Sequence, residues 1–264
     1  MKILIVNDDG IKGRGIIALA KEIAKNHEVV VVAPREEKSA SSHSISIHNP
    51  IRIREEHLDD SFKAYSLVGT PADCTQAGLL LIGKDIDLVL SGINRGINCG
   101  TDVLYSGTVS AAIEGAICGY PSIALSMEVE WTRKDEDYTK AANWANKIVD
   151  MAEKQYLRKN IVLNVNIPKV NEEEIKGLKV CKLGKAGYKT EYLLIEDNEE
   201  KIYEIKGTMN EVEKDETDTY YLKEGYVTLT PLQYDFTNFK ILEEVEKQFT
   251  NNNYNMQLRL CSKV

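Results

Sequence analysis

The chain has 264 residues, of which 43% are hydrophobic and 28% charged, proportions typical of a globular protein and not of a disordered or fibrous one. Its formal net charge of -8 and pI of about 5.2 argue against a broad DNA- or RNA-binding surface, which needs clustered lysine and arginine. Any phosphorylated ligand would need a local cation or backbone dipoles to offset this negative field.

The first 25 residues lack the basic, apolar and cleavage segments of a secretory signal. No apolar run approaches the roughly 20 residues that span a bilayer. The five cysteines are scattered without a C-x-x-C pair, which indicates reduced thiols. We therefore expect a cytoplasmic protein with no membrane partner.

The N-terminal half alternates apolar runs with segments of helical periodicity. Runs at residues 2–6 and 29–32 predict strands, and between them apolar side chains recur at helical spacing. The same alternation predicts strands at 64–68, 86–90, 122–126 and 161–167, and helices at 72–82, 109–118 and 137–156. Continuous apolar strands separated by helices indicate a parallel sheet covered on both faces. We expect an α/β fold with a doubly wound, mostly parallel, Rossmann-like sheet in three α/β/α layers.

The pattern changes after Pro168. Strands are predicted at 188–195 and 201–205, joined by an acidic, turn-rich segment, and together they form a protruding β-hairpin. Because a lone hairpin is poorly stable, we expect it to dock on a second subunit. A strand at 226–230, a helix near 239–249 and a short tail from Asn251 complete the chain. This divides the chain into a catalytic core at 1–185 and an oligomerisation appendage at 186–264.

The unusual polar residues follow predicted strands. In open parallel sheets, ligands bind outside the carboxyl ends of the strands. The loops at those ends contain Asn7-Asp8-Asp9-Gly10, residues 38–43 and residues 91–98. Two adjacent carboxylates repel each other unless a cation or hydrogen-bond donors face them. An isolated Asp-Gly is also ordinary turn chemistry, but the oxygen-bearing neighbouring loops favour a divalent ion.

The predicted ligands of this ion are oxygen atoms of Asp8, Asp9, Ser39 and Asn94. Such hard ligands favour one Mg or Mn ion, with Ca also compatible, over Zn or Cu. Two alternatives stay open at this point. Ser39 would instead cap its own serine-rich loop, and Asn94 would be a left-handed turn residue.

A second candidate site is the start of the helix near Val109. Ser106, Gly107 and Thr108 precede it, and a helix start offers free backbone N–H groups and the positive end of the helix dipole. This predicts an anion site, with the alternative that Ser106 or Thr108 serves only as the N-cap. The nearby glycines fit neither a Walker loop nor a dinucleotide fingerprint.

Taken together, these segments resemble the SurE survival-protein family. The resemblance is carried by residues 3–10, 32–39, 69–74 and 91–108, and by Gly225 to Leu232 with Asp235. It implies a 5′-nucleotidase, a metal-dependent phosphatase of nucleoside 5′- and 3′-monophosphates and, in some members, of short polyphosphate. It also implies homodimers or homotetramers built through the C-terminal hairpin and helix.

The resemblance also implies functional residues. Metal ligands would be Asp8, Asp9, Ser39 and Asn94, in agreement with the set chosen from residue chemistry. Phosphate contacts would map onto Asn98, Ser106, Gly107 and Thr108. Asp8 and Asp9 are the predicted catalytic residues, with Asp9 accepting the proton of the attacking water.

Two rival functions remain open from the sequence. A covalent aspartyl-phosphate route also uses acidic residues after the first strand, but its pattern is D-x-D and not adjacent aspartates. A Mg-binding, phosphorylation-receiver-like signalling module needs an acceptor aspartate where this chain has Ser91-Gly92-Ile93-Asn94. A panel of nucleotides would discriminate the hydrolase from the signalling module.

Overall fold

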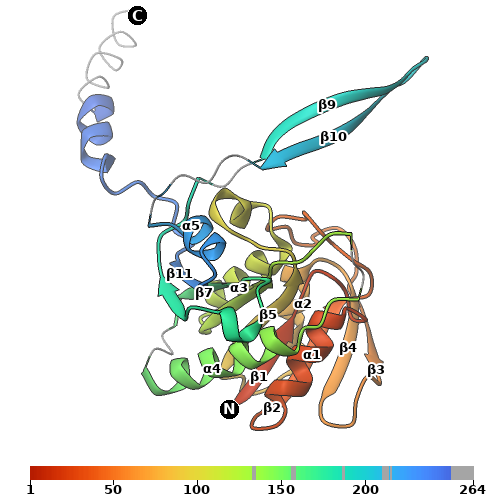
Figure 1. Ribbon diagram of the computed structural model, residues 1–264. Helices are drawn as coiled ribbons and strands as arrows, with labels where there is room; N and C mark the ends of the chain where they lie inside the picture. The colour runs from red at the N-terminus through yellow and green to blue at the C-terminus, as the bar shows by residue number, and fades with distance from the viewer. Residues whose placement is uncertain (133–134, 156–158, 186–187, 210–213, 215, 251–264) are drawn as a thin grey trace, which may run out of the picture. The chain divides into compact units, whose positions relative to one another are not determined.

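The computed structural model describes residues 1–132, 135–155, 159–185, 188–209, 214 and 216–250 (Figure 1). Packing within the chain separates two units, Met1–Leu232 and Gln233–Val264. The first unit contains the sheet and the candidate site, and the second contains a helical segment at 242–250. The predicted tail from Asn251 lies outside the described residues.

A nine-stranded sheet organises the first unit, in the order β3-β4-β2-β1-β5-β6-β7-β11-β8. Its strands are β1 (Lys2–Val6), β2 (Glu28–Pro34), β3 (Arg52–Glu56), β4 (Lys63–Val68), β5 (Leu88–Arg95), β6 (Ser122–Met127), β7 (Val162–Ile167), β8 (Leu178–Val180) and β11 (Val227–Leu232). The six strands from β4 to β7 pair in parallel. Strand β3 pairs antiparallel with β4, and β11 pairs antiparallel with β7.

Helices cover both faces of this sheet (Figure 1). Helices α1 (Arg14–Ile23) and α4 (Thr139–Gln155) share one apolar core with Ile3 and Ile5. Helices α2 (Pro71–Ala77) and α3 (Gly107–Ile117) share the other with Leu4 and Val6. Because successive strand side chains point to opposite faces, one continuous apolar strand supplies both cores. The predicted three-layer, doubly wound α/β fold is confirmed.

The predicted hairpin is also confirmed. Strands β9 (Tyr188–Asp197) and β10 (Lys201–Met209) form an antiparallel sheet of their own. Strand β11, which we grouped with the appendage, instead lies between β7 and β8 of the main sheet. The predicted boundary after residue 185 divides catalytic segments from oligomerisation segments, and it stays a prediction. The boundary between the two packing units is a different one and falls after Leu232.

Several short elements were not expected from the sequence. They are β3, β8, α5 (Asp218–Lys223), and the single turns η2 (Gly100–Leu104) and η3 (Glu172–Glu174). None carries an apolar run or period that marks it: β3 is as long as β1 but is charged and largely exposed. The helix predicted at 72–82 changes at Gly78 into a π-helical turn, η1 (Gly78–Ile82). Within the described residues, no helix combines the length and apolarity that crossing a membrane requires.

Candidate functional site

The order of the strands creates a crevice between β1 and β5. From β1 the chain adds β2 and β4 on one side, then returns to add β5, β6 and β7 on the other. Ligands of doubly wound sheets bind at such a switch point, outside the carboxyl ends of the strands. Asp8 and Asp9 lie two and three residues after the end of β1, and Asn94 is the penultimate residue of β5. The topology therefore brings three of the predicted metal ligands to the two sides of one crevice.

The loop after β1 is held by Asn7, whose side chain is fully buried. Its Nδ2 donates to the Gly10 carbonyl at 3.0 Å, and its Oδ1 accepts from the Gly10 N–H at 3.2 Å. Gly10 has a φ of +92°, a conformation that L-residues with a side chain rarely adopt. This turn fixes the backbone of the two aspartates between its ends.

Asp8 is buried and the neighbouring Asp9 is half-buried, so two like charges lie side by side. Asp8 is 4% exposed, and burial raises the pKa of its carboxyl although the Thr108 hydroxyl donates to it. Burial, followed by the negative charge of Asp8, raises the pKa of Asp9 to about 7. The Arg95 backbone N–H donates to Asp9 at 3.2 Å. These donors only partly offset the cost of burying two carboxylates, so the pair is suited to a cation.

Two further loops close on this pair. The Lys38 N–H donates to the Asp8 carbonyl at 2.7 Å, which attaches the loop after β2. A Cβ on Gly107 would lie 2.7 Å from the Asp8 Cβ and 3.0 Å from the Ser41 Oγ, so only glycine fits at the start of α3. The Ser41 hydroxyl is buried and has no hydrogen-bond partner among the described residues. The two loops therefore pack directly against Asp8.

Ser39 and Asn94 each adjoin a residue whose backbone N–H donates to one of the two aspartates, Lys38 to Asp8 and Arg95 to Asp9. Their side chains, however, have other partners. The exposed Ser39 hydroxyl donates to Glu37 at 2.6 Å. The Asn94 Nδ2 donates to the Gly96 carbonyl at 3.0 Å, which leaves the amide oxygen as the atom that can hold a cation. The described residues contain no group of three or more His, Cys, Asp or Glu suited to a metal. An ion at this crevice would therefore depend on serine and asparagine oxygens as well as the two carboxylates.

The predicted phosphate contacts divide into two groups. Ser106 accepts from the Val109 N–H at 3.0 Å, so it is the N-cap of α3, and Gly107 and Thr108 adjoin Asp8. Asn98 is buried, and its Nδ2 donates to Ser126 at 2.8 Å. Its backbone N–H donates to the Asn166 side chain at 2.8 Å, so Asn98 anchors its loop on β6 and β7. Phosphate contact by these four residues stays a prediction.

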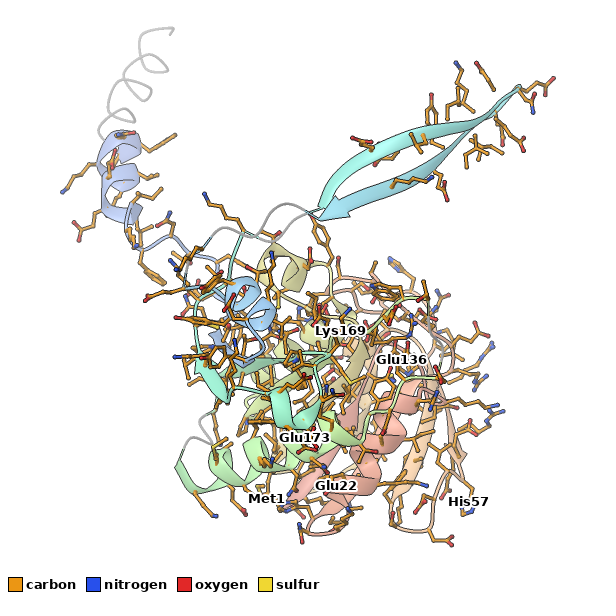
Figure 2. All side chains as sticks on the ribbon, viewed as in Figure 1. Met1, Glu22, His57, Glu136, Lys169 and Glu173 are labelled. Atoms are coloured by element: carbon orange, nitrogen blue, oxygen red, sulfur yellow. The ribbon has the colours of Figure 1, made fainter. Side chains whose placement is uncertain are left out.

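A cavity of about 330 Å³ beside Asp9 was not foreseen from the sequence. Arg95, Trp131, Glu136 and Tyr138 line it together with Asp9. Glu136, labelled in Figure 2, lies on the segment between β6 and α4. That segment also follows the carboxyl end of a parallel strand, where ligands of such sheets bind. The tryptophan in this segment was therefore the sequence feature that could have indicated the cavity.

Asp218 is a second unforeseen residue, fully buried at the start of α5. Its carboxylate accepts from the Gly100 N–H at 2.8 Å and from the Gly184 N–H at 2.7 Å. This contact ties η2, which leads into the N-terminus of α3, to the C-terminal part of the sheet. No local sequence pattern marks an aspartate that acts over 118 residues.

Comparison with known proteins identifies the family of this chain. A family model described as Survival protein SurE matches residues 3–190. The chain belongs to the SurE family. A SurE protein of Aquifex aeolicus, solved by crystallography, is 38% identical with a TM-score of 0.81, covering 94% of this chain and 99% of that one.

Curated SurE relatives are closer in sequence. One from Clostridium botulinum strain Alaska E43 is 69% identical over 94% of this chain and 100% of its own length. One from Clostridium beijerinckii is 61% identical over 94% of this chain and 99% of its own. Both relatives are named 5′-nucleotidase SurE. The matched range contains all the predicted site residues of this SurE chain.

Proposed function

We propose that this SurE protein is a metal-dependent phosphomonoesterase that hydrolyses nucleoside 5′-monophosphates, and also 3′-monophosphates and short polyphosphates. Relatives that are 61 to 69% identical along almost the whole chain are named 5′-nucleotidase, which supports a hydrolase acting on nucleotides. The metal, the 3′-activity and the polyphosphate activity rest on residue chemistry and on the family resemblance.

The Asp8–Asp9 pair at the switch point, with Asp8 buried and Asp9 half-buried, is the observation that carries the metal proposal. A net charge of -8 and two adjacent carboxylates would repel a phosphate dianion from this crevice. A divalent cation at the pair reverses the sign of the local field. The proposed ligands are Asp8, Asp9, Ser39 and Asn94, an oxygen set that suits one Mg or Mn ion per subunit.

When bound there, the ion would polarise a phosphoryl oxygen and lower the pKa of a bound water. The chain's own residues have three further roles in this proposal. Thr108 orients Asp8 through its hydroxyl, the α3 N-terminus at Gly107 faces the phosphate, and Asp9 accepts the proton of the attacking water. Ser106 and Asn98 hold the backbone from which these groups project.

The receiver-like signalling alternative finds no support at β5. This strand carries Ser91, Gly92 and Asn94 near its carboxyl end and has no acidic residue. A phosphorylation receiver needs an aspartate there as the phosphoacceptor. The described crevice therefore suits hydrolysis better than storage of a phosphoryl group.

Phosphate release across a panel of nucleotides and polyphosphates, with EDTA or with added Mg or Mn, tests the proposal. We expect release from 5′- and 3′-monophosphates that EDTA abolishes and metal restores. If no nucleotide in the panel released phosphate in the presence of metal, the proposed function would be contradicted.

Replacing either carboxylate by its amide tests the metal ligands separately. Asp8→Asn and Asp9→Asn should each lower turnover by orders of magnitude, because each removes a charged ligand from the ion. Calorimetric titration with Mn should show weakened metal binding in both variants. Asp60→Asn, at a side chain that is 98% exposed, is the matched control and should leave binding and turnover unchanged. Near-normal turnover of either site variant would remove that aspartate from the mechanism.

A further inference from the structure

The cavity beside Asp9 is lined both by this proposed metal ligand and by the segment between β6 and α4. Its lining combines an aromatic side chain, two arginines, three carboxylates and a tyrosine. These residues are Asp9, Gly13, Arg14, Glu37, Arg95, Trp131, Glu136 and Tyr138. A volume of about 330 Å³ falls at the lower end of the range of small-molecule pockets.

Trp131 is held in this cavity as an aromatic platform. The Arg95 guanidinium covers its ring at 4.7 Å from the centroid, and Gly96 packs so closely that a Cβ there would lie 2.9 Å from the indole. The residue is nevertheless 65% exposed, which is unusual for so large an apolar side chain. A fixed indole with an open surface can stack a planar ligand without further ordering of the side chain.

The Arg95 side chain is itself fixed. Its Nε and Nη2 both donate to the Glu136 Oε1, at 2.9 and 2.7 Å. Because Glu136 already neutralises this guanidinium, the pair offers little net charge to an incoming anion. Its role is to hold the platform in position.

The lining of the cavity offers a phosphate no excess of positive charge. Three carboxylates face two arginines, one of which is paired with Glu136. Tyr138 is 5% exposed, and burial followed by the charges of Asp9 and Glu136 raises the pKa of its hydroxyl to about 12. A neutral tyrosine and carboxylate oxygens can bind sugar hydroxyls and the amino groups of a base. The lining therefore suits an uncharged polar ring system.

We infer that this cavity is the nucleoside subsite, in which the base stacks on Trp131 while the phosphate lies at Asp8 and Asp9. The inference deepens the proposed function and rests on it. It makes Trp131 the residue that recognises the base, and Arg95 and Glu136 the residues that position Trp131. The alternative is that Trp131 only covers Gly96.

Two substrates that differ only in the base separate these roles. We expect Trp131→Ala to raise the KM for AMP by about 5- to 100-fold, from the usual strength of base stacking on an aromatic side chain. The KM for ribose 5-phosphate should stay unchanged, because this sugar phosphate has no base. Trp131→Phe should restore most of the affinity for AMP. Trp144→Phe, at the other tryptophan, is the matched control and should change neither KM.

An equal rise in both KM values would overturn the inference, since it would indicate a structural role for Trp131. Fluorescence provides a test that does not depend on hydrolysis. In the Trp144→Phe background, Trp131 is the remaining tryptophan, and adenosine should quench its emission whereas ribose should not. Absence of quenching by adenosine would also overturn the inference. Quenching without hydrolysis of any nucleotide would instead contradict the proposed function while supporting the subsite.

Discussion

Thr108 is the residue that couples the α3 N-terminus to the candidate metal ligand. It is fully buried, and its hydroxyl donates to the Asp8 carboxylate. The hydrogen bond fixes one oxygen of Asp8 and opposes the rise in its pKa on burial. Partners that orient a metal ligand in this way usually matter almost as much as the ligand itself.

Thr108→Val removes this hydroxyl while keeping the size of the side chain. We expect turnover in the presence of saturating metal to fall by roughly 10- to 100-fold, because Asp8 loses its orienting donor. Steady-state hydrolysis of AMP measures the effect. Ser110→Ala is the matched control, since this buried hydroxyl on the same helix donates to the Ser106 carbonyl and not to Asp8. Equal losses in the two variants would argue against a specific role for Thr108.

At the scale of elements, Glu114 joins three segments around the site. It is 5% exposed on α3, and its carboxylate binds His43 Nε2 and Gln76 Nε2, both at 2.6 Å. His43 lies in the loop after β2, and Gln76 lies on α2. The hydrogen bond from His43 is the largest cause of a pKa of Glu114 below its ordinary value. The charged carboxylate therefore stabilises the packing of this loop on α2 and α3.

The lowered pKa makes this contribution dependent on pH. A carboxyl whose pKa is depressed by folding stabilises the protein above its unfolded pKa of 4.5, and the effect is lost as pH falls through the folded pKa. Glu114→Gln should lower the free energy of unfolding by about 1 to 3 kcal/mol at pH 7. The difference from the unmodified protein should shrink below about pH 4.5. Denaturant titrations at several pH values measure it.

Glu28→Gln serves as the control for this prediction. Its side chain is 66% exposed and paired with Lys2, so the substitution should change stability by less than about 0.5 kcal/mol. A Glu114→Gln difference that stays constant from pH 7 to pH 3 would refute the proposed charge effect.

At the scale of the whole molecule, the hairpin exposes apolar side chains that the described part of the chain does not cover. Ile205 is 64% exposed and lies opposite Tyr192, which is 66% exposed. Apolar patches on a soluble protein commonly mark interaction surfaces. The family resemblance implies a homodimer or homotetramer built through this hairpin, and we keep that assembly as a proposal.

A charge placed on the patch tests the assembly. Ile205→Glu should shift the protein to a smaller species in size-exclusion chromatography with light scattering, because burying an unpaired carboxylate at an interface is unfavourable. The unfolding midpoint of the core should stay the same, since β9 and β10 pair only with each other among the described strands. Lys206→Gln, which makes the same one-unit change in charge at the neighbouring exposed residue, controls for charge alone. An unchanged mass for Ile205→Glu would place the interface elsewhere.

The sequence by itself determined the layers, the parallel strands and the hairpin, because apolar periodicity is a local property of the chain. It also identified Asp8 and Asp9, since adjacent carboxylates after a buried strand need an explanation at any position. Short elements such as β3 and α5 escaped prediction because their sequences carry no apolar run or period; β3 is charged and largely exposed.

Only the tertiary structure decided which loops meet at the crevice. The order of the strands placed β1 beside β5, and so brought the Arg95 backbone to Asp9 and Thr108 to Asp8. It also brought Trp131 to the same rim, although Trp131 lies 122 positions after Asp9 in the sequence. Such contacts depend on chain topology, and the residues next to Trp131 in the sequence do not predict which distant residues it contacts.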